Sequence, residues 1–153
     1  MANELSTNVN TNELTQYIVI KIGDEQYGID IKYIDNIVRL PQITRVPKVP
    51  AHFLGVINLR GEVIPVMSLR IKMGLEADSP NKDTRIIIIK MAQYEAIGMM
   101  VDSVKEVVNL SSEMIEAMGN DKREEAAYVR GIGKHDGGLI SLLDLELILQ
   151  EIQ

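Results

Sequence analysis

The sequence contains no cysteine and no tryptophan, and it has a single phenylalanine. The lack of cysteine excludes disulfide bonds, thiolate nucleophiles and cysteine-based metal sites, and it suits a cytoplasmic protein. Only 4% of the residues are aromatic although 46% are hydrophobic. The core is therefore expected to be aliphatic, built from isoleucine, valine, leucine and methionine.

Positive charge and long hydrophobic runs are also scarce. The 153 residues include 16 Lys and Arg against 22 Asp and Glu, a net charge of −6. Because nucleic-acid binding needs a basic face to neutralise phosphates, this balance argues against a nucleic-acid partner. The longest aliphatic run in a predicted strand, residues 86–89, is far shorter than the roughly 20 residues that a bilayer span requires. We expect a soluble protein without direct membrane contact.

No catalytic or metal-binding pattern stands out. His52 and His135 lie far apart in sequence, and neither has a second potential ligand three or four residues away. The glycines of residues 131–138 resemble a phosphate loop, but a strand follows where that loop requires a helix, so we predict a hairpin turn. We expect no enzyme and no cofactor or metal site. A small-ligand-binding protein that uses this glycine turn is the alternative.

Short β-rich runs separated by tight turns predict a mainly β, or all-β, protein. Single strands are expected over 17–22, 26–29, 84–91 and 96–101, and hairpins over 55–67 and 128–143. Helical spacing of apolar residues predicts short helices over 30–38, 110–118 and 143–152. The remaining segments are a flexible tail over 1–15, a proline-interrupted edge strand over 40–50, a linker over 77–83 and a charged loop over 119–126.

The chain also carries a partial internal repeat. Residues 53–69 fall on residues 129–145 after a shift of 76 positions, and the glycines at both ends of the two hairpins coincide. A shift of 70 positions places Gly28 on Gly98, Ile34 on Val104 and Ile37 on Val107. We interpret this as a duplicated β-unit. Two antiparallel barrels of about five strands each, over 16–81 and 82–153, would use the whole chain, and the terminal segments could cross between them.

The bend of the first hairpin is the most informative feature. It places Arg60 between Leu59 and Gly61, at a stiff turn beside apolar neighbours. Arginine is a residue that protein interfaces favour, and its stem can pack while its head stays in water. The second copy has His135 and Asp136 in place of Leu59 and Arg60. The tip of the first hairpin is therefore better explained by contact with a partner than by folding.

These residues resemble the CheW family of bacterial chemotaxis coupling proteins, over roughly Tyr17 to Ile152. The resemblance is carried by the segments 23–31, 44–47, 55–70, 97–98 and 101–104. It implies two SH3-like five-stranded β-barrels packed about a third hydrophobic interface. It also implies a non-catalytic adaptor, without a cofactor, that couples chemoreceptors to the histidine kinase CheA.

The partners implied are the CheW-like regulatory domain of CheA and the cytoplasmic tip of methyl-accepting chemoreceptors. The resemblance thus implies a cytoplasmic protein recruited to receptor arrays at the inner face of the membrane. A CheW-like regulatory module in another two-component pathway is the alternative. The sequence shows no kinase or receiver pattern, so a separate coupling protein is expected.

The resemblance also transfers site residues to this sequence. The receptor-binding residues would be Ile34, Asn36, Ile37, Gly55, Asn58, Leu59 and Arg60. The kinase-binding residues would be Ile18 and Ile31, on an exposed strand edge of the first barrel. Family members usually have glutamate at the position of Asn36, where it can pair with the hairpin arginine. We therefore expect Arg60 either to be held by a neutral hydrogen bond or to be free.

Overall fold

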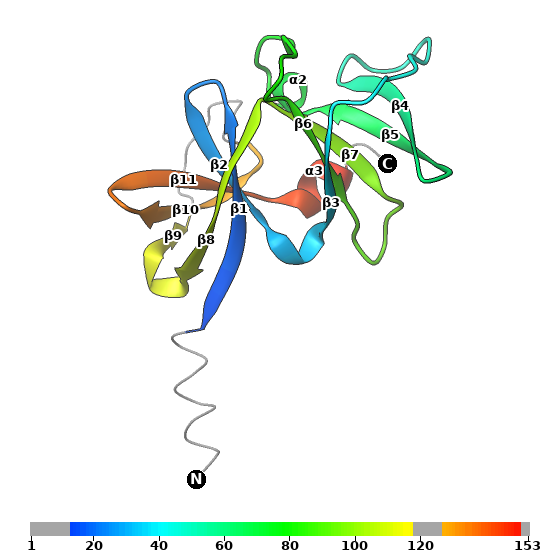
Figure 1. Ribbon diagram of the computed structural model, residues 1–153. Coiled ribbons are helices and arrows are strands. Elements are labelled where there is room, and N and C mark those ends of the chain that lie inside the picture. Colours follow the sequence, from blue (N-terminus) through cyan, green and yellow to red (C-terminus); the bar gives the residue numbers. More distant parts are fainter. Residues whose placement is uncertain (1–12, 118–126, 151–153) are drawn as a thin grey trace.

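Strands form where β-branched side chains concentrate, because these side chains pack well on a pleated surface. The computed structural model describes residues 13–117 and 127–150, and more than half of them lie in strands (Figure 1). In chain order the strands are β1 (Leu14–Ile22), β2 (Glu25–Asp30), β3 (Ile34–Arg39), β4 (Phe53–Leu59), β5 (Glu62–Ser68), β6 (Arg85–Ile89), β7 (Ile97–Val101), β8 (Ser103–Ser111), β9 (Ile115–Ala117), β10 (Val129–His135) and β11 (Gly138–Leu143). The helical elements are η1 (Ile31–Tyr33), α2 (Leu69–Lys72), η2 (Ser112–Met114) and α3 (Leu145–Gln150). The expected mainly β fold class is confirmed.

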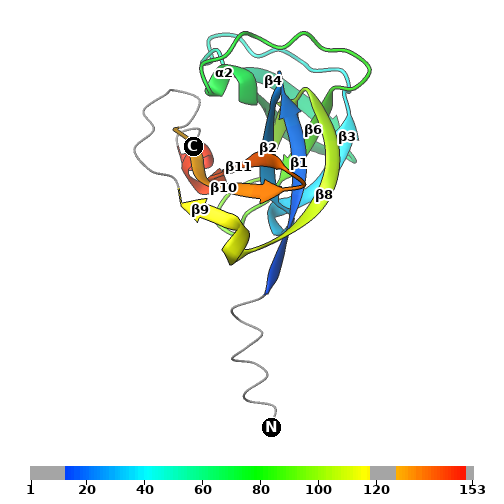
Figure 2. The same cartoon turned by 90° about the vertical axis from the view of Figure 1, so that its left-hand side faces the viewer.

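The strands form two sheets, and each sheet combines strands from both halves of the chain (Figures 1 and 2). Sheet A has the order β8-β1-β2-β11-β10-β9, and sheet B has the order β3-β6-β7-β5-β4. Each is the basis of one SH3-like subdomain, although neither ladder of described strands closes into a ring. The expected division into 16–81 and 82–153 does not match the sheets, because β3 to β5 lie with β6 and β7. A terminal segment does cross over: the N-terminal hairpin, β1 and β2, lies in the sheet formed by β8 to β11 of the second half.

The sequence repeat reappears at the two parallel junctions of the sheets. Gly28 of β2 lies opposite Leu142 of β11, and Gly98 of β7 lies opposite Val66 of β5. A Cβ atom at position 28 would lie 2.8 Å from a methyl carbon of Leu142, and one at position 98 would lie 2.8 Å from a methyl carbon of Ile86. Real Cβ atoms do not approach neighbours so closely. Glycine is therefore needed at both places where a hairpin of one half pairs with a hairpin of the other, on β2 against β11 and on β7 against β5.

Three hydrophobic clusters hold the molecule together. The central core joins the two sheets, and each sheet also has a smaller core of its own. The central core includes Ile18, Ile20, Ile22, Tyr27 and Ile29 from sheet A and Met67, Ile87, Ile89, Ile97 and Met99 from sheet B. The sheet A core contains Tyr17, Val19, Val108, Leu110, Ile140 and Leu142, and the sheet B core contains Ile57, Ile64, Val66, Ile86, Ile88 and Met100. This arrangement agrees with two subdomains packed about a third interface.

Two of the expected helices are wrong. Asp30 does act as an N-cap, accepting a hydrogen bond from the Lys32 amide at 3.0 Å, but the helix that follows is only the three-residue η1. Residues 34–39 then form β3, which pairs with β6. Over 110–118, β8 continues to Ser111, and η2 and β9 replace the helix. In both places a short 3-10 turn leads into the outermost strand of a sheet, β3 in sheet B and β9 in sheet A. The hydrogen bonds between strands favour this structure over the helix that the spacing of the apolar residues predicts.

The ends and connections also differ in part from expectation. β1 begins at Leu14, inside the segment expected to be a tail, while residues 1–12 and the charged loop at 119–126 lie outside the described residues. The segment 40–50 contributes only one isolated bridge, between Thr44 and Val56, instead of an edge strand. The C-terminal helix is confirmed as α3, and the linker over 77–83 contains no strand or helix.

A polar clamp ties the two sheets together beside the central core. Arg70 of α2 donates two hydrogen bonds to Asp102, from Nε to Oδ1 at 2.8 Å and from Nη2 to Oδ2 at 2.7 Å. Asp102 lies between β7 and β8, where the chain passes from sheet B to sheet A. Its Oδ2 also accepts the backbone N–H of Gly23, in the β1–β2 turn, at 2.8 Å. One carboxylate thus connects α2, the crossover and the tip of a sheet A hairpin.

Removing the charge of Asp102 tests this clamp. We expect Asp102→Asn to lower the free energy of unfolding by about 1–2 kcal/mol near neutral pH, because two charge-assisted hydrogen bonds are weakened. Hydrogen bonds from Arg70 hold the pKa of Asp102 below its ordinary value of 3.8. Since the folded pKa is the lower one, the stabilisation is complete only above the unfolded pKa, at about pH 5 and higher, and is lost as the pH falls through the folded pKa.

Urea denaturation of both proteins over a range of pH measures the effect. The difference in unfolding free energy between the natural chain and Asp102→Asn is expected to shrink between about pH 5 and pH 2. A difference that stays constant as the pH falls would contradict the clamp. Glu106→Gln is a suitable control, because the ion pair of this exposed carboxylate among the described residues is with its neighbour Lys105, at 3.8 Å.

Candidate protein-interaction site

The hairpin formed by β4 and β5 turns through only two residues, Arg60 and Gly61. Both have positive φ, 55° for Arg60 and 83° for Gly61. Positive φ at both central residues defines the type I′ turn, whose twist matches that of the flanking strands. Glycine adopts this conformation freely, but an arginine pays a steric cost for it. The sequence predicted a bend here, and the structure adds that Arg60 itself is in the left-handed region.

The second hairpin provides a direct comparison. Asp136 and Gly137 occupy the equivalent turn between β10 and β11, with φ of 50° and 76°. Type I′ turns prefer Asn-Gly and Asp-Gly, because short polar side chains tolerate positive φ. The second copy therefore has the residue that folding favours, and the first copy has Arg60 instead. An outlier of this kind points to a function for Arg60 that the turn does not itself require.

The neighbours of Arg60 serve to shape the turn. The Asn58 side chain accepts a hydrogen bond from the Gly61 amide, with 3.2 Å between Oδ1 and N. Leu59 is half-buried and packs against the sheet B core. Gly55 is buried with φ of 143°, and a Cβ atom there would lie 2.2 Å from the Thr44 carbonyl oxygen. Gly55 was expected at the receptor contact. Because a side chain would not fit at this buried position, the fold itself already requires glycine here.

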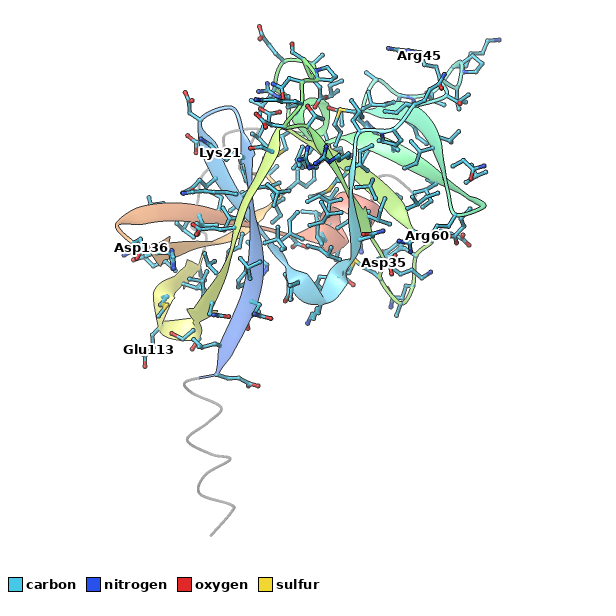
Figure 3. All side chains as sticks on the ribbon, viewed as in Figure 1. Lys21, Asp35, Arg45, Arg60, Glu113 and Asp136 are labelled. Carbon is cyan, nitrogen blue, oxygen red and sulfur yellow. The ribbon has the colours of Figure 1, made fainter. Side chains whose placement is uncertain are left out.

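The Arg60 guanidinium makes no hydrogen bond or ion pair with the residues that the structure describes. No hydrogen bond joins Asn36 to it, and the Asn36 side-chain oxygen instead accepts the Ile37 amide at 2.8 Å. Of the two expected states, a neutral hydrogen bond or a free side chain, the structure has the free one. Figure 3 shows Arg60 at the hairpin end, on the same side of the molecule as Asp35 of β3. The charge of Arg60 is available to a partner.

The expected receptor-binding residues fall into two groups. Asn58, Leu59 and Arg60 lie at the end of the β4–β5 hairpin, whereas Ile34, Asn36 and Ile37 lie on β3. These strands are the two outer strands of sheet B, at opposite ends of its strand order. Ile34 and Ile37 are half-buried and pack against the central core. The groups thus border one sheet from opposite edges.

Sequence reasoning missed two exposed apolar side chains near these groups. Val63 is 65% exposed and lies directly opposite Asn58 in the hairpin ladder. Val107 of β8 is 47% exposed, and its neighbour Val104 packs against the central core as Ile34 does. The signal for Val107 was present in the sequence, because the 70-position shift lays Ile37 on it. Val63 had no such signal, since apolar residues follow turns in most hairpins.

Two strands at the edges of the sheets, as formed by the described residues, accompany these side chains. β3 forms one edge of sheet B, and β8 forms one edge of sheet A. Figure 2 shows both strands on the same side of the molecule. The outward backbone groups of an edge strand are available for pairing with another chain. The arrangement can therefore accept a protein partner along backbone edges as well as through side chains.

The expected kinase contact is wrong in one respect. β1 is not an exposed edge, because it lies between β8 and β2 in sheet A. Ile18 is only 6% exposed and belongs to the central core. Its side chain is a packing element and is not free for a partner. Ile31 of η1 is half-buried and packs against the same core, so part of its surface faces solvent.

The described residues offer little for catalysis or metal binding. No group of three or more His, Cys, Asp or Glu side chains among them is arranged to hold a metal ion. The glycines of 131–138 form the β10–β11 hairpin, as predicted, and no helix opens behind them. In the part of the chain that the structure describes, no helix is long and apolar enough to cross a membrane.

Comparison with known proteins agrees with this geometry. The family model described as CheW-like domain matches residues 16–153. Chemotaxis protein CheW of Helicobacter pylori is 38% identical over 139 residues, which cover 91% of this chain and 84% of that protein. Chemotaxis protein CheW of Bacillus subtilis is 30% identical over 148 residues, which cover 96% and 93%. The crystal structure of the scaffolding protein TtCheW from Thermoanaerobacter tengcongensis superposes with a TM-score of 0.82 at 32% identity, covering 88% of this chain and 92% of that one. The chain belongs to the CheW-like domain family.

Proposed function

We propose that this protein is a non-catalytic adaptor that couples chemoreceptors to the histidine kinase CheA in bacterial chemotaxis. Relatives named chemotaxis protein CheW and a relative described as a scaffolding protein support this role. The observation that carries the proposal is the hairpin end, where Arg60 has positive φ and forms no hydrogen bond or ion pair with the described residues. Folding alone favours aspartate or asparagine at this position, as in the second copy.

In this proposal the cytoplasmic tip of a chemoreceptor binds to sheet B and the adjoining edge of sheet A. The contact includes Arg60 and Val63 at the hairpin end, with Asn58 and Leu59 holding the turn. Ile34, Asn36 and Ile37 on β3 supply the opposite border, and Val107 on β8 extends it. The receptor contact thus draws on both outer strands of sheet B and on the edge strand β8 of sheet A.

The second partner is the CheW-like regulatory domain of CheA. An adaptor needs two surfaces that can be occupied together, so the kinase contact must lie away from the hairpin end. We place this contact at η1, where the chain passes from sheet A to sheet B and where the partly exposed Ile31 can touch the kinase. Ile18 contributes only indirectly, by packing in the central core against which Ile31 lies. The protein then works at the inner face of the membrane through its partners.

Transmission through such an adaptor is mechanical. A bound receptor tip that shifts against sheet B moves sheet A, because the central core and the clamp at Asp102 join the two sheets. Well-packed cores transmit displacement with little compression. The kinase domain bound on the other side therefore changes position when the receptor changes conformation.

The receptor contact can be tested by removing two side chains. We expect Arg60→Ala and Ile34→Ala each to weaken binding to a purified receptor tip fragment about tenfold, because each removes contact area or charge from the interface. Isothermal titration calorimetry measures the affinity, and circular dichroism verifies the fold. Asp136→Ala is the matched control at the equivalent turn. If both variants bind as tightly as the natural chain while folded, the receptor site is assigned to the wrong residues.

Exchanging the two turn residues separates folding from binding. We expect Arg60→Asp to stabilise the protein by about 0.5–1 kcal/mol, since aspartate tolerates positive φ better, and to weaken receptor binding. Asp136→Arg is expected to destabilise by a similar amount and to leave receptor binding unchanged. Urea denaturation and calorimetry provide the two readouts. Equal loss of receptor binding in both variants would argue against a special role for the first hairpin.

The kinase contact requires variants that distinguish surface from core. Ile18→Ala is expected to lower the unfolding free energy by about 2–4 kcal/mol, because it removes part of the central core. Ile31→Ala is expected to weaken capture of the CheA regulatory domain with a smaller loss of stability. Pull-downs with the regulatory domain and the receptor tip, separately and together, measure the result. Unimpaired kinase capture by folded Ile31→Ala would move the contact elsewhere.

A further inference from the structure

Charge is unevenly distributed along this acidic chain. The residues from Asn36 to Gly61 include four cations, Arg39, Arg45, Lys48 and Arg60, and no Asp or Glu, in a protein of net charge −6. Arg45 and Lys48 lie in the connection between β3 and β4, residues 40–52, and are its only charged residues apart from the titratable His52. This connection is therefore a local basic region on a molecule that is negative elsewhere.

The two cations of the connection are exposed and unpaired. Among the described residues neither Arg45 nor Lys48 forms an ion pair or a side-chain hydrogen bond, whereas Arg70 and Lys134 each have a carboxylate partner. Val46 lies between them in sequence and is 37% exposed. Figure 3 shows Arg45 extending into solvent, far from Lys21 of β1.

The connection is rigid although it contains no strand or helix. Thr44 and Val56 exchange two backbone hydrogen bonds of 2.8 Å, and the Ser68 amide donates to the His52 carbonyl at 2.7 Å. Pro41, Pro47 and Pro50 restrict the backbone further. A rigid segment loses little conformational entropy when a partner binds, so its contacts convert more fully into affinity.

Two hollows open beside the connection. The first, of about 460 Å³, is lined chiefly by apolar residues that include Leu40, Ile43 and Met100, and one carboxylate, Asp78, also lines it. The second, of about 450 Å³, lies under residues 45–50 beside Phe53. Both hollows are bordered by Arg45 and Leu54. The apolar residues of the hollows suit apolar side chains of a partner, and the exposed cations Arg45 and Lys48 beside them suit carboxylates that flank those side chains.

We propose that the connection between β3 and β4 is a third binding surface, which docks an acidic segment of a protein partner that inserts apolar side chains into the two hollows. The surface goes beyond the adaptor function, because it overlaps neither Arg60 at the hairpin end nor Ile31 at the kinase contact. A protein segment fits better than a lipid surface, since headgroups would not fill apolar hollows. The net charge of −6 also opposes approach to an anionic membrane, whereas a short segment senses mainly charges within about 8 Å.

A labelled synthetic peptide of alternating glutamate and leucine is a suitable probe, with fluorescence polarisation as the readout. We expect the full chain to bind it, and the double variant Arg45→Glu, Lys48→Glu to bind about tenfold more weakly or worse. The control is Lys21→Glu, Lys90→Glu, which changes net charge equally and lies outside the surface. Equal weakening by both double variants would overturn the proposal, because net charge would then explain the binding.

Further probes test the chemistry of the occupant. Poly-glutamate, which lacks apolar side chains, is expected to bind the natural chain at least about tenfold more weakly than the alternating peptide. Vesicles of phosphatidylglycerol and phosphatidylcholine are expected not to compete. Equal affinity for poly-glutamate, or displacement of the peptide by vesicles, would overturn the proposal. Binding of the receptor tip by the Arg45, Lys48 double variant is expected to be unchanged, so that failure here is distinguishable from failure of the adaptor function.

Discussion

The aliphatic interface between the two sheets is the constraint on which the rest of the structure depends. Neither sheet can be built from one half of the chain, so the central core must be buried before any strand edge or hairpin has a fixed position. Each fully buried isoleucine or leucine in such a core contributes about 1.5–3 kcal/mol. The carboxylate of Asp102 then orients the sheets, because its donors come from α2 and from the β1–β2 turn. Nondirectional burial supplies the stability, and a directional clamp fixes the geometry.

Much of this could be predicted from the sequence, and the failures have physical causes. Turn residues and β-branched runs located the hairpins, and repeated glycines revealed the duplication. Helical spacing misled at Ile34, because a free edge of β6 offered ladder hydrogen bonds that local periodicity does not reveal. Ile18 was expected on an exposed edge strand. That expectation failed because β8, which pairs with β1, comes from a distant part of the sequence. The hairpin bend and the repeat singled out Arg60, and the resemblance added Asn58 and Gly55, but only the backbone angles and contacts separate their roles.

The duplication gave the chain two copies of one hairpin, whose turns carry different residues. Both hairpins turn through two residues of positive φ and are followed by an exposed apolar side chain, Val63 in the first copy and Leu139 in the second. The second copy retains the turn residue that favours folding, Asp136. The first copy has Arg60 and bears the associated cost in its own turn. Comparing the two copies thus separates the residue that the turn favours for folding, aspartate, from the residue that the first turn exposes to a partner, arginine.

The interleaving of the two halves also affects how the protein is made. β2 needs β11 as its neighbour, and β1 needs β8, so contacts between distant residues dominate both sheets. Folding rates fall as the mean sequence separation of contacts rises. During synthesis, the first half would leave the ribosome with its apolar faces uncovered until the C-terminal hairpin had been translated. The same topology that makes two subdomains move as one body therefore requires the whole chain before either subdomain is complete.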